Sequence, residues 1–367
     1  MPDHSFTPSF RWPDLAGKEF SERLLAWWDV HGRKNLPWQD PRTPYRVWVS
    51  EIMLQQTQVT TVVPYFERFM QHFPDLATLA SSSMDEVLSL WAGLGYYARG
   101  RNLHKTAGII MRDFDGKFPG SSAELARLPG IGESTANAII SQAWDIPATV
   151  VDGNVRRVLA RHDVIDGWPG KKEVQIVFWQ AAEQRLPSDR GADYTQAIMD
   201  LGATLCTRRK PRCIDCPVSN DCMAYLSDTT DLYPAKRPKI KITEKHMHML
   251  IISNGNDQIL LERRPPAGIW GGLWSLPEDE DEQALANRFG LDSEMFFKMP
   301  DLDHRLTHMK IYIKPRAIRS TPVAKRVESS SDQRWFGAKE WSKAGLPKPV
   351  LILLKQHQQE YTNDTNG

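Results

Sequence analysis

The feature that most constrains this chain is a cluster of four cysteines. Cys206, Cys213, Cys216 and Cys222 fall within seventeen residues, and the 367-residue chain has no others. In a reducing cytosol such a cluster is typical of metal ligation rather than of a disulfide framework. The spacing contains one close Cys-x2-Cys pair, whereas a structural zinc site usually has two. A cubane iron–sulfur cluster therefore fits better, although the ligand types alone leave zinc open.

The loop between the first two cysteines, TRRKPR, is strongly basic. A short turn of this composition is often only a solvated surface loop. A rigid metal-bound loop that carries several cations is also a good contact for nucleic-acid phosphates, and we favour this interpretation for residues 206–222. The basic side chains are those of Arg208, Arg209, Lys210 and Arg212.

The periodicity of the chain changes once. Apolar residues first recur at spacings of three and four, as in STANAIISQAW, which predicts an all-α domain over 1–230. Residues 231–245 are rich in Pro, Lys and Arg and predict an extended basic linker. Strand-like segments such as HMLIIS and MKIYIKPRAI then alternate with helical ones. They predict a separate α+β domain over 246–355, followed by a disordered tail over 356–367.

Composition excludes several classes of protein. Apolar residues make up 41% and charged residues 25% of the chain, enough to bury cores, so disorder over most of the length is excluded. No apolar run approaches the roughly eighteen residues of a membrane helix, and the N-terminus has no apolar secretion signal. We therefore expect an intracellular protein. The net charge is only +1, so any contact with nucleic acid must be local.

A glycine hairpin, LPGIG, joins two helical stretches at residues 128–132. Gly130 and Gly132 permit a tight turn and leave backbone amides free at the start of the helix from Glu133 onward. Such a helix start attracts phosphate through its free N–H groups and the helix dipole. An ordinary helix–turn–helix connection is the alternative interpretation.

Asp152 follows twenty residues after Gly132, at the predicted start of a further helix. The hairpin, this aspartate and the cysteine loop together resemble the helix-hairpin-helix superfamily of base-excision DNA glycosylases. The segments YRVWVSEIMLQQTQV (45–59) and WAGLGYYARGRNLH (91–104) narrow the resemblance to the MutY family of adenine DNA glycosylases. It is dense over about 20–225 and looser in the C-terminal domain.

This resemblance implies an enzyme of base excision repair. Members remove adenine that is mispaired with 8-oxoguanine or guanine in double-stranded DNA, which they bind as monomers. By resemblance the four cysteines hold a [4Fe-4S] cluster, and the enzyme works in the bacterial cytoplasm on nucleoid DNA. The expected fold is an all-α helix-hairpin-helix glycosylase domain with an iron–sulfur loop, followed by an α+β domain.

Release of adenine needs a proton on the departing base and a negative charge beside the oxocarbenium-like sugar. Two carboxylates in different surroundings supply both. The resemblance implies that Glu51 protonates the base and that Asp152 stabilises the sugar. The apolar neighbours Trp48 and Ile52 would raise the pKa of Glu51 toward neutral pH. A solvent-facing glutamate and a helix N-cap are the plain alternatives for the two residues.

The resemblance also implies how adenine leaves the duplex, a step that costs unstacking free energy. Leu54 and Gln56 would enter the vacated stack, and Tyr96 would lie beside the opposite guanine. Core packing is the alternative for the aromatic residues. The other residues expected to contact the base, the sugar or DNA phosphates are Lys34, Trp38, Gly130, Gly132, Asn154, Arg156, Gln196, Arg208 and Arg209.

Ser134 distinguishes two kinds of glycosylase. Related bifunctional enzymes such as endonuclease III carry a lysine at this hairpin position, which forms a Schiff base and cleaves the strand. Because this chain has serine there, we predict a monofunctional glycosylase that leaves the abasic strand intact. A pyrimidine-lesion glycosylase with lyase activity, as in endonuclease III, is the alternative.

The segment ILLERRPPAGIWGGLWSLPE (259–278) resembles a MutT-type, or Nudix, fold. Gly272 and Glu278 match the start of the hydrolase motif, but its metal-binding glutamates are missing, so we expect no magnesium site. The resemblance implies an 8-oxoguanine recognition domain. Thr307 and His308 keep the hydroxyl and the imidazole of the family's Phe-Ser-His turn, whereas leucine replaces the aromatic residue.

Two functions from other classes remain open. One is a nucleotide pyrophosphatase that acts through residues 246–355, against which the missing glutamates count. The other is a noncatalytic DNA-binding protein that uses the hairpin and the cysteine loop only to bind phosphates.

Overall fold

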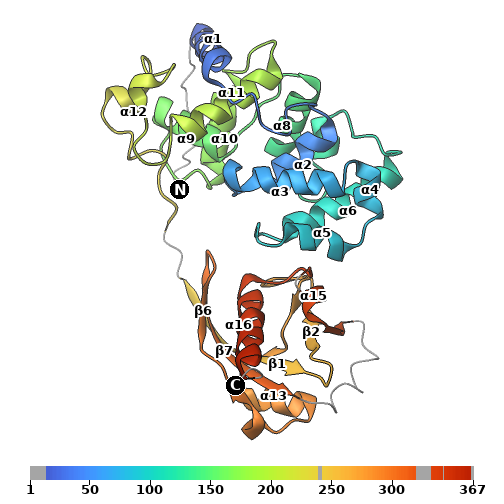
Figure 1. Ribbon diagram of the computed structural model, residues 1–367. Coiled ribbons are helices and arrows are strands. Elements are labelled where there is room, and N and C mark those ends of the chain that lie inside the picture. Colours follow the sequence, from blue (N-terminus) through green and yellow to red (C-terminus); the bar gives the residue numbers. More distant parts are fainter. Residues whose placement is uncertain (1–13, 239–241, 320–331, 342, 365–367) are drawn as a thin grey trace, which may run out of the picture. The chain divides into compact units, whose positions relative to one another are not determined.

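The computed structural model of the chain divides into two compact units (Figure 1). The first unit contains Met1–Glu67 and Gly108–Pro238, and the second contains Arg68–Ala107 and Lys239–Gly367. The sequence predicts contiguous domains, whereas each unit is built from two stretches of chain. The residues that the structure describes are 14–238, 242–319, 332–341 and 343–364.

Helices make up the ordered elements of the described chain up to Pro238, as the periodicity predicts. Hydrogen-bonding caps set several of their ends: Thr43 accepts from the backbone N–H of Arg46 at the start of α2, and Ser83 and Glu86 form a capping box on α5. The helices are α1 Asp14–His31, α2 Pro44–Leu54, α3 Val59–His72, α4 Leu76–Ser81, α5 Met84–Trp91, α6 Ala98–Asp113, α7 Ser122–Leu125, α8 Glu133–Trp144, α9 Gly153–His162, α10 Lys172–Glu183, α11 Gly191–Thr204, the 3-10 turn η1 Cys213–Asp215, and α12 Met223–Leu226.

A hydrophobic core holds α1, α9, α10 and α11 together in the first unit. Phe20, Leu24 and Trp28 are spaced by four residues, so they lie on one face of α1 and are buried together. They pack in one cluster with Leu159 of α9 and Leu201 of α11. This core positions the start of α9 and the end of α11, the two places where the polar residues discussed below gather.

The second unit contains a mixed eight-stranded sheet. Its two longest strands, β1 and β7, pair in parallel from Thr243↔Met309 to Ser253↔Arg319, and the remaining pairs are antiparallel. The strands are β1 Thr243–Ser253, β2 Ile259–Arg263, β3 Trp274–Ser275, β4 Glu278–Asp279, β5 Phe297–Lys298, β6 Leu302–Arg305, β7 Met309–Arg319 and β8 Gln333–Phe336.

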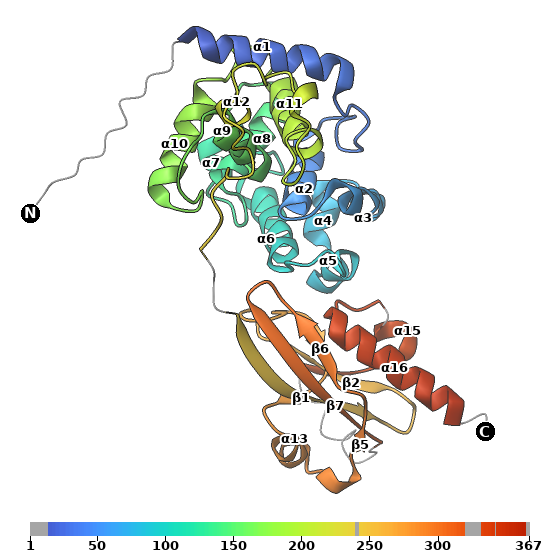
Figure 2. The same cartoon turned by 90° about the vertical axis from the view of Figure 1, so that its left-hand side faces the viewer.

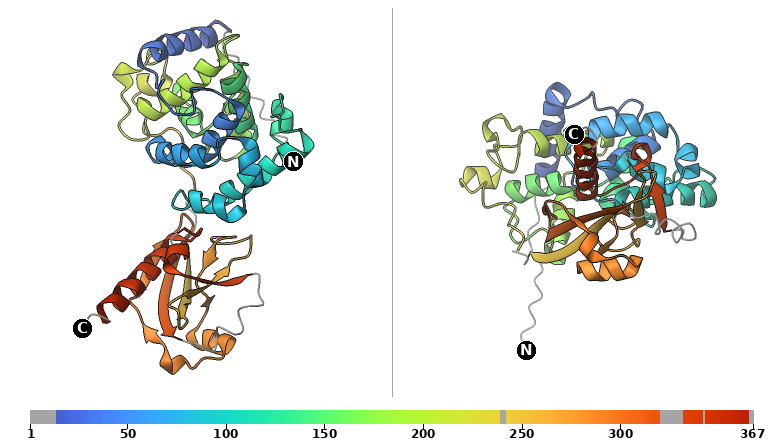
Figure 3. Two further views of the ribbon diagram at one scale, coloured as in Figure 1. Left: turned by 45° about the vertical axis from the view of Figure 1, so that its right-hand side comes forward. Right: turned by 60° about the horizontal axis from the view of Figure 1, so that its bottom comes forward.

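Helices cover both faces of this sheet (Figures 2 and 3). On one face Leu250 and Ile252 of β1 pack against α13. On the other face Met249 and Ile251 pack in one cluster with Val350 of α16. The alternation of neighbouring β1 residues between two cores explains why this strand is apolar at every position from Met249 to Ile252. The helical elements here are α13 Glu282–Phe289, the 3-10 turn η2 Ser293–Met295, α15 Ala338–Trp341 and α16 Lys348–Asp364.

Two predicted boundaries need correction. The linker predicted over 231–245 is shorter at both ends, because Tyr233 accepts a hydrogen bond from Arg161, Arg237 lies over the Trp168 ring, and β1 begins at Thr243. The tail predicted to be disordered over 356–367 is helical up to Asp364, because α16 extends beyond the apolar segment KPVLILL into the polar residues that follow it. No described helix is both long and apolar enough to cross a membrane.

Candidate active site

A cleft of about 1100 Å³ opens in the first unit between residues of α2, α8, α9 and α11. Glu51 and Asp152, the two carboxylates predicted to act together, both line it. They come from helices that are a hundred residues apart in the sequence. The other predicted site residues that line the cleft are Trp38, Leu54, Gln56, Ser134, Asn154, Gln196 and Arg208.

Glu51 lies in the last turns of α2, half-buried between the buried residues Ser50 and Ile52. Its Oε1 accepts a hydrogen bond of 2.8 Å from Nε2 of Gln142 on α8. Burial raises the pKa of Glu51 to about 7, the hydrogen bond from Gln142 opposes this shift, and the charge of Asp152 adds to it. A carboxyl group with this pKa can hold a proton at neutral pH and release it to a substrate.

Asp152 is the N-cap of α9. Its Oδ1 accepts from the backbone N–H groups of Asn154 (2.9 Å) and Val155 (2.7 Å), and its Oδ2 accepts from Nδ2 of Asn154 (3.2 Å). Burial raises the pKa of Asp152, while these hydrogen bonds and the charge of Arg157 oppose that shift. Three donors aimed at one carboxyl group favour its anionic form. The capping role and a role in the cleft therefore coexist at this residue.

The glycine hairpin has the geometry that its sequence predicts. Gly130 has a positive φ of 82°, which favours glycine, and Gly132 caps α8 without a side-chain hydrogen bond, so the first amides of that helix have no side-chain acceptor there. Ser134 follows in the first turn of α8 and lines the cleft. Its Oγ accepts a hydrogen bond of 3.1 Å from the backbone N–H of Val151, next to Asp152.

Arg157, rather than the predicted Arg156, lines the cleft. Its Nη2 donates to Oδ1 of Asn154 at 2.8 Å, and its Nε donates to the carbonyl oxygen of Cys206 at 2.7 Å. Arg156, the residue before Arg157 on α9, does not line the cleft. It is half-buried, and burial lowers its pKa. The sequence places both arginines on one helix but does not determine which of them faces the cleft.

Lys34, a predicted site residue, does not line the cleft, whereas its neighbour Arg33 does. The Lys34 side chain is exposed and its Nζ donates to the carbonyl oxygen of Asp29 at 2.5 Å.

Gln142, the hydrogen-bond partner of Glu51, is also a residue that the sequence interpretation missed. The signal was a glutamine inside the apolar segment IISQAW, since a buried amide in such a helix needs a polar partner.

Three predicted site residues belong to the second unit. Tyr96 is 48% exposed and has a positive φ of 49°. Thr307 and His308 are exposed in the turn between β6 and β7, which the hydrogen bond from Leu306 N–H to the Met309 carbonyl closes at 2.8 Å. The side chain of Leu306 packs against the core of the sheet. The leucine that departs from the family pattern is therefore a packing residue here.

The four cysteines line one cavity of the first unit, together with Arg161 and His162. Burial raises the pKa of Cys216 to about 12 and that of Cys222 to about 11, so these thiols ionise readily only beside a positive charge such as a metal. Within the described ranges, no three His, Cys, Asp or Glu side chains converge closely enough to hold one metal ion. Four cysteine thiols are nevertheless the donor set that an iron–sulfur cluster takes.

Arg161 is buried at the centre of this loop. Its Nη1 donates to Sγ of Cys206 at 3.4 Å and to the carbonyl oxygen of Thr207 at 2.7 Å. Its Nε donates to the carbonyl oxygens of Thr230 at 2.8 Å and Tyr233 at 3.1 Å. One cation thus ties the first cysteine to the segment through which the chain leaves the first unit.

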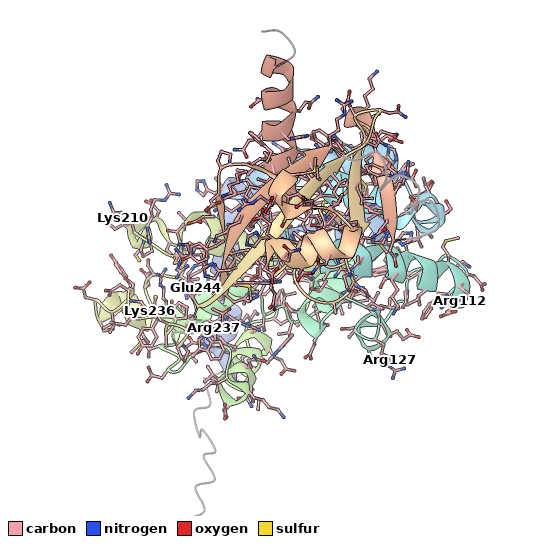
Figure 4. The ribbon with its side chains drawn as sticks, turned by 90° about the horizontal axis from the view of Figure 1, so that it is seen from below. Arg112, Arg127, Lys210, Lys236, Arg237 and Glu244 are labelled. Atoms are coloured by element: carbon pink, nitrogen blue, oxygen red, sulfur yellow. The ribbon has the colours of Figure 1, made fainter. Side chains whose placement is uncertain are left out.

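The basic residues of the loop are divided between the cleft and the solvent. Arg208 is exposed and lines the cleft that holds Glu51 and Asp152. Arg209 and Lys210 are exposed on the loop, and Figure 4 labels Lys210 there. Cations beside a cleft of this kind are suited to bind the phosphates of a nucleic acid.

Comparison with solved structures supports the helical fold. A thermostable thymine-DNA glycosylase is similar over 59% of this chain and 100% of its own, with 25% sequence identity and a TM-score of 0.51. An endonuclease III bound to DNA superposes equally well, with a TM-score of 0.51 over 59% of this chain and 99% of that one, at 20% identity.

Comparison with sequence families assigns both halves of the chain. Residues 49–184 match the HhH-GPD superfamily of base excision DNA repair proteins, and residues 248–356 match the NUDIX domain. An adenine DNA glycosylase of Buchnera aphidicola from Schizaphis graminum is 37% identical over 92% of this chain and 98% of its own length. That of Mus musculus is 31% identical over 97% of this chain and 82% of its own length. The chain therefore belongs to the adenine DNA glycosylases, enzymes of base excision repair.

Proposed function

We propose that the enzyme excises adenine opposite 8-oxoguanine or guanine in double-stranded DNA, with Glu51 as the acid and Asp152 as the stabilising anion. The observation that carries this proposal is the pairing of the two carboxylates in one cleft: burial brings the pKa of Glu51 to about 7, while three hydrogen bonds favour the anion of Asp152. The monomeric enzyme would work on nucleoid DNA in the bacterial cytoplasm.

The proposed reaction begins with an adenine nucleotide turned out of the duplex into the cleft. Glu51 gives its proton to a ring nitrogen of adenine, and the glycosidic electrons leave with the base. The sugar is then a cation, and Asp152 stabilises it by charge. Water adds to the sugar and returns its proton to Glu51, so that free adenine and an abasic site are formed and the acid is restored.

Leu54, Gln56 and Trp38 support this pathway by their place in the same cleft. Gln56 has a positive φ of 60° two residues after the end of α2, so the backbone leaves the helical conformation there. In the proposed complex Leu54 and Gln56 fill the space that the base leaves. Tyr96, exposed on the second unit, would lie beside the opposite guanine.

A monofunctional reaction follows from Ser134. Its hydroxyl is neutral, carries no amine and is engaged with the backbone N–H of Val151, so it cannot form a Schiff base with the abasic sugar. A nicking assay on the abasic product without alkali is expected to leave the strand intact. Efficient strand cleavage that disappears on mutation of a lysine would contradict this.

Cys206, Cys213, Cys216 and Cys222 would hold a [4Fe-4S] cluster. Bound there, the cluster would supply a rigid cross-link that fixes the basic loop, while Arg208 and Arg209 bind DNA phosphates. Analysis for iron and acid-labile sulfide tests this: equal amounts of both, in a brown protein, are expected. A colourless protein that contains one zinc ion would contradict it.

The second unit would recognise 8-oxoguanine through the exposed turn at Thr307 and His308. Its sheet belongs to the NUDIX fold, yet phosphoanhydride hydrolysis is not favoured, because Glu278 is bound to Arg264 rather than free to hold a cation. Replacement of Thr307 by Val together with His308 by Ala is expected to lower the preference for 8-oxoguanine over guanine. Unchanged preference would argue against this turn as the lesion contact.

The decisive experiment is single-turnover release of adenine by Glu51→Gln from a duplex containing an A:8-oxoguanine pair. We expect a loss of about a hundred- to ten-thousandfold in rate, the range for a general acid, with duplex binding retained. Glu173→Gln, in the exposed first turn of α10, is the matched control and is expected to keep the wild-type rate. Adenine release by Glu51→Gln at the wild-type rate would refute the assignment.

A further inference from the structure

A buried carboxylate that does not itself line the cleft binds two residues that do. Asp200, on α11, is 1% exposed. Its Oδ2 accepts from Nε1 of Trp28 at 3.1 Å and from the backbone N–H of Arg33 at 2.8 Å. Its Oδ1 accepts from Nε (2.9 Å) and Nη2 (2.6 Å) of Arg33 and from Nε2 of Gln196 (2.8 Å). Five donors converge on one buried carboxylate.

Two of the residues that Asp200 holds, Arg33 and Gln196, line the cleft. An ionised carboxylate can only accept hydrogen bonds. The amide nitrogen of Gln196 must therefore face Asp200, and its amide oxygen must point away from that carboxylate. Gln196 lies one helical turn before Asp200, so the two side chains share a face of α11 and the contact needs no movement of the backbone.

The guanidinium of Arg33 is fixed in the same way. Both of its bonded nitrogens lie on the Asp200 side, which leaves Nη1 for other partners. Asp200 thus orients one acceptor, the Gln196 amide oxygen, and one donor group, Arg33, within a single cleft. Adenine presents an amino donor at N6 and a ring acceptor at N7, whereas guanine presents acceptors at both O6 and N7.

We propose that Asp200 is a positioning residue for base specificity: by fixing the direction of the Gln196 amide, it makes the cleft select a purine with a 6-amino group over one with a 6-oxo group. This inference rests on the proposed placement of the extruded adenine in the cleft. A base with a 6-carbonyl would bring an oxygen against the Gln196 oxygen. The amide cannot turn over to relieve that contact without leaving a buried carboxylate facing another acceptor.

The test compares two bases, adenine and hypoxanthine, each opposite 8-oxoguanine, in single-turnover excision by wild type and Asp200→Asn. The asparagine amide can donate as well as accept, so Gln196 can turn over. We expect the ratio of the adenine rate to the hypoxanthine rate to fall by about tenfold or more, as for the loss of one hydrogen-bond constraint. A merely structural defect would lower both rates and leave the ratio unchanged.

Asp193→Asn is the matched control. Asp193 lies on the same helix and pairs with Arg190 at 3.0 Å, and its carboxylate accepts no hydrogen bond from Gln196 among the described residues. Its rate ratio is expected to equal that of wild type. If wild type releases no adenine at all, the proposed function fails; if wild type releases adenine and folded Asp200→Asn keeps the wild-type ratio, only the role of Asp200 is overturned.

A second variant keeps the proposal testable if Asp200→Asn does not fold. Gln196→Leu removes the amide and keeps most of the side-chain volume. If Asp200 acts through Gln196, then Gln196→Leu must lower the same ratio of the adenine rate to the hypoxanthine rate. Where both single variants fold, the double variant is expected to fall no further than Gln196→Leu alone. A wild-type ratio in Gln196→Leu, or additive losses in the double variant, would overturn the inference.

Discussion

The cleft of the first unit is lined by two carboxylates, Glu51 and Asp152, and a pocket of about 300 Å³ in the second is lined by three, of which Glu262 and Glu278 are compared with them. In the second unit, Glu262 is bound to Arg288 and accepts from Gln333 at 2.6 Å, and Glu278 is bound to Arg264. In the first unit, neither carboxylate of the cleft forms an ion pair within the described ranges.

This difference shows how surroundings decide what a carboxylate does. A guanidinium bound to a carboxylate occupies its oxygens, so the group is not free to bind a cation. Burial without a bound cation raises the pKa of a carboxyl group, as the pKa of about 7 for Glu51 shows. Glu51 is therefore suited to acid–base chemistry, whereas Glu262 and Glu278 are held by arginines within their own unit.

The largest effect is expected for Asp152→Asn, which removes the charge from the cleft. The adenine excision rate should fall about a hundred- to a thousandfold, the scale for the loss of one electrostatic contact to a transition state. Because asparagine caps helices almost as well as aspartate, the stability of α9 should change little. Single-turnover kinetics and thermal unfolding measure the two effects separately.

Asp75→Asn serves as the control for this variant, since Asp75 caps α4 through a 2.8 Å bond from the Thr78 N–H. It should leave excision unchanged. A rate for Asp152→Asn within a few-fold of wild type would show that this residue is only a cap.

Glu51→Gln should stabilise the protein at high pH. The pKa of Glu51 rises from 4.5 to about 7 on folding, so its protonated form contributes stability that is fully present below 4.5 and is lost as pH rises through 7. At about pH 8 the variant should gain about 3 kcal/mol in unfolding free energy, against less than about 1 kcal/mol near pH 5. Urea denaturation at both pH values measures this gain, and an equal gain at both would contradict the raised pKa.

Excision should slow above neutral pH, because Glu51 must be protonated to act as an acid. Its rate is expected to fall about tenfold per pH unit above 7. Gln142 donates to the charged carboxylate and so lowers the pKa of Glu51. Gln142→Leu should move the falling limb of the pH profile to higher pH. A limb that stays in place, or moves to lower pH, would show that Glu51 is not the titrating acid.

The smallest effect is expected in the second unit. A variant with both Glu262→Gln and Glu278→Gln should excise adenine from an A:G duplex at the wild-type rate. Neither it nor wild type should hydrolyse 8-oxo-dGTP with magnesium, since the arginine-bound carboxylates hold no cation. If wild type hydrolysed 8-oxo-dGTP with magnesium and the double variant did not, Glu262 and Glu278 would be catalytic, and the contrast with Glu51 and Asp152 would be wrong.

Much of the fold was predictable because its local signals agree. The change from helical to strand-like periodicity, the glycine hairpin and the cysteine spacing all correspond to observed elements. The raised pKa of Glu51 was predictable from its apolar neighbours on α2, and the capping role of Asp152 from its place before a helix. These features depend on residues within one or two helical turns.

The partners of those residues were not predictable. Gln142 contacts Glu51, and Asp200 contacts Arg33, across long distances in the sequence, and periodicity along a helix does not determine which other element its polar residues face. Arg33 and Arg157, rather than Lys34 and Arg156, line the cleft for the same reason. Long-range contacts select between adjacent side chains that local patterns cannot distinguish.

The hydrogen bonds of Arg161 have a consequence for the way the two units are connected. The same guanidinium binds Cys206 and the carbonyls of Thr230 and Tyr233, so a disordered cysteine loop that displaced Arg161 would also remove hydrogen bonds from the end of the first unit. A molecule made without the proposed cluster would then hold the segment at Thr230 and Tyr233 less firmly. Protease sensitivity between α12 and Pro238 would thereby report whether the proposed cluster had been inserted.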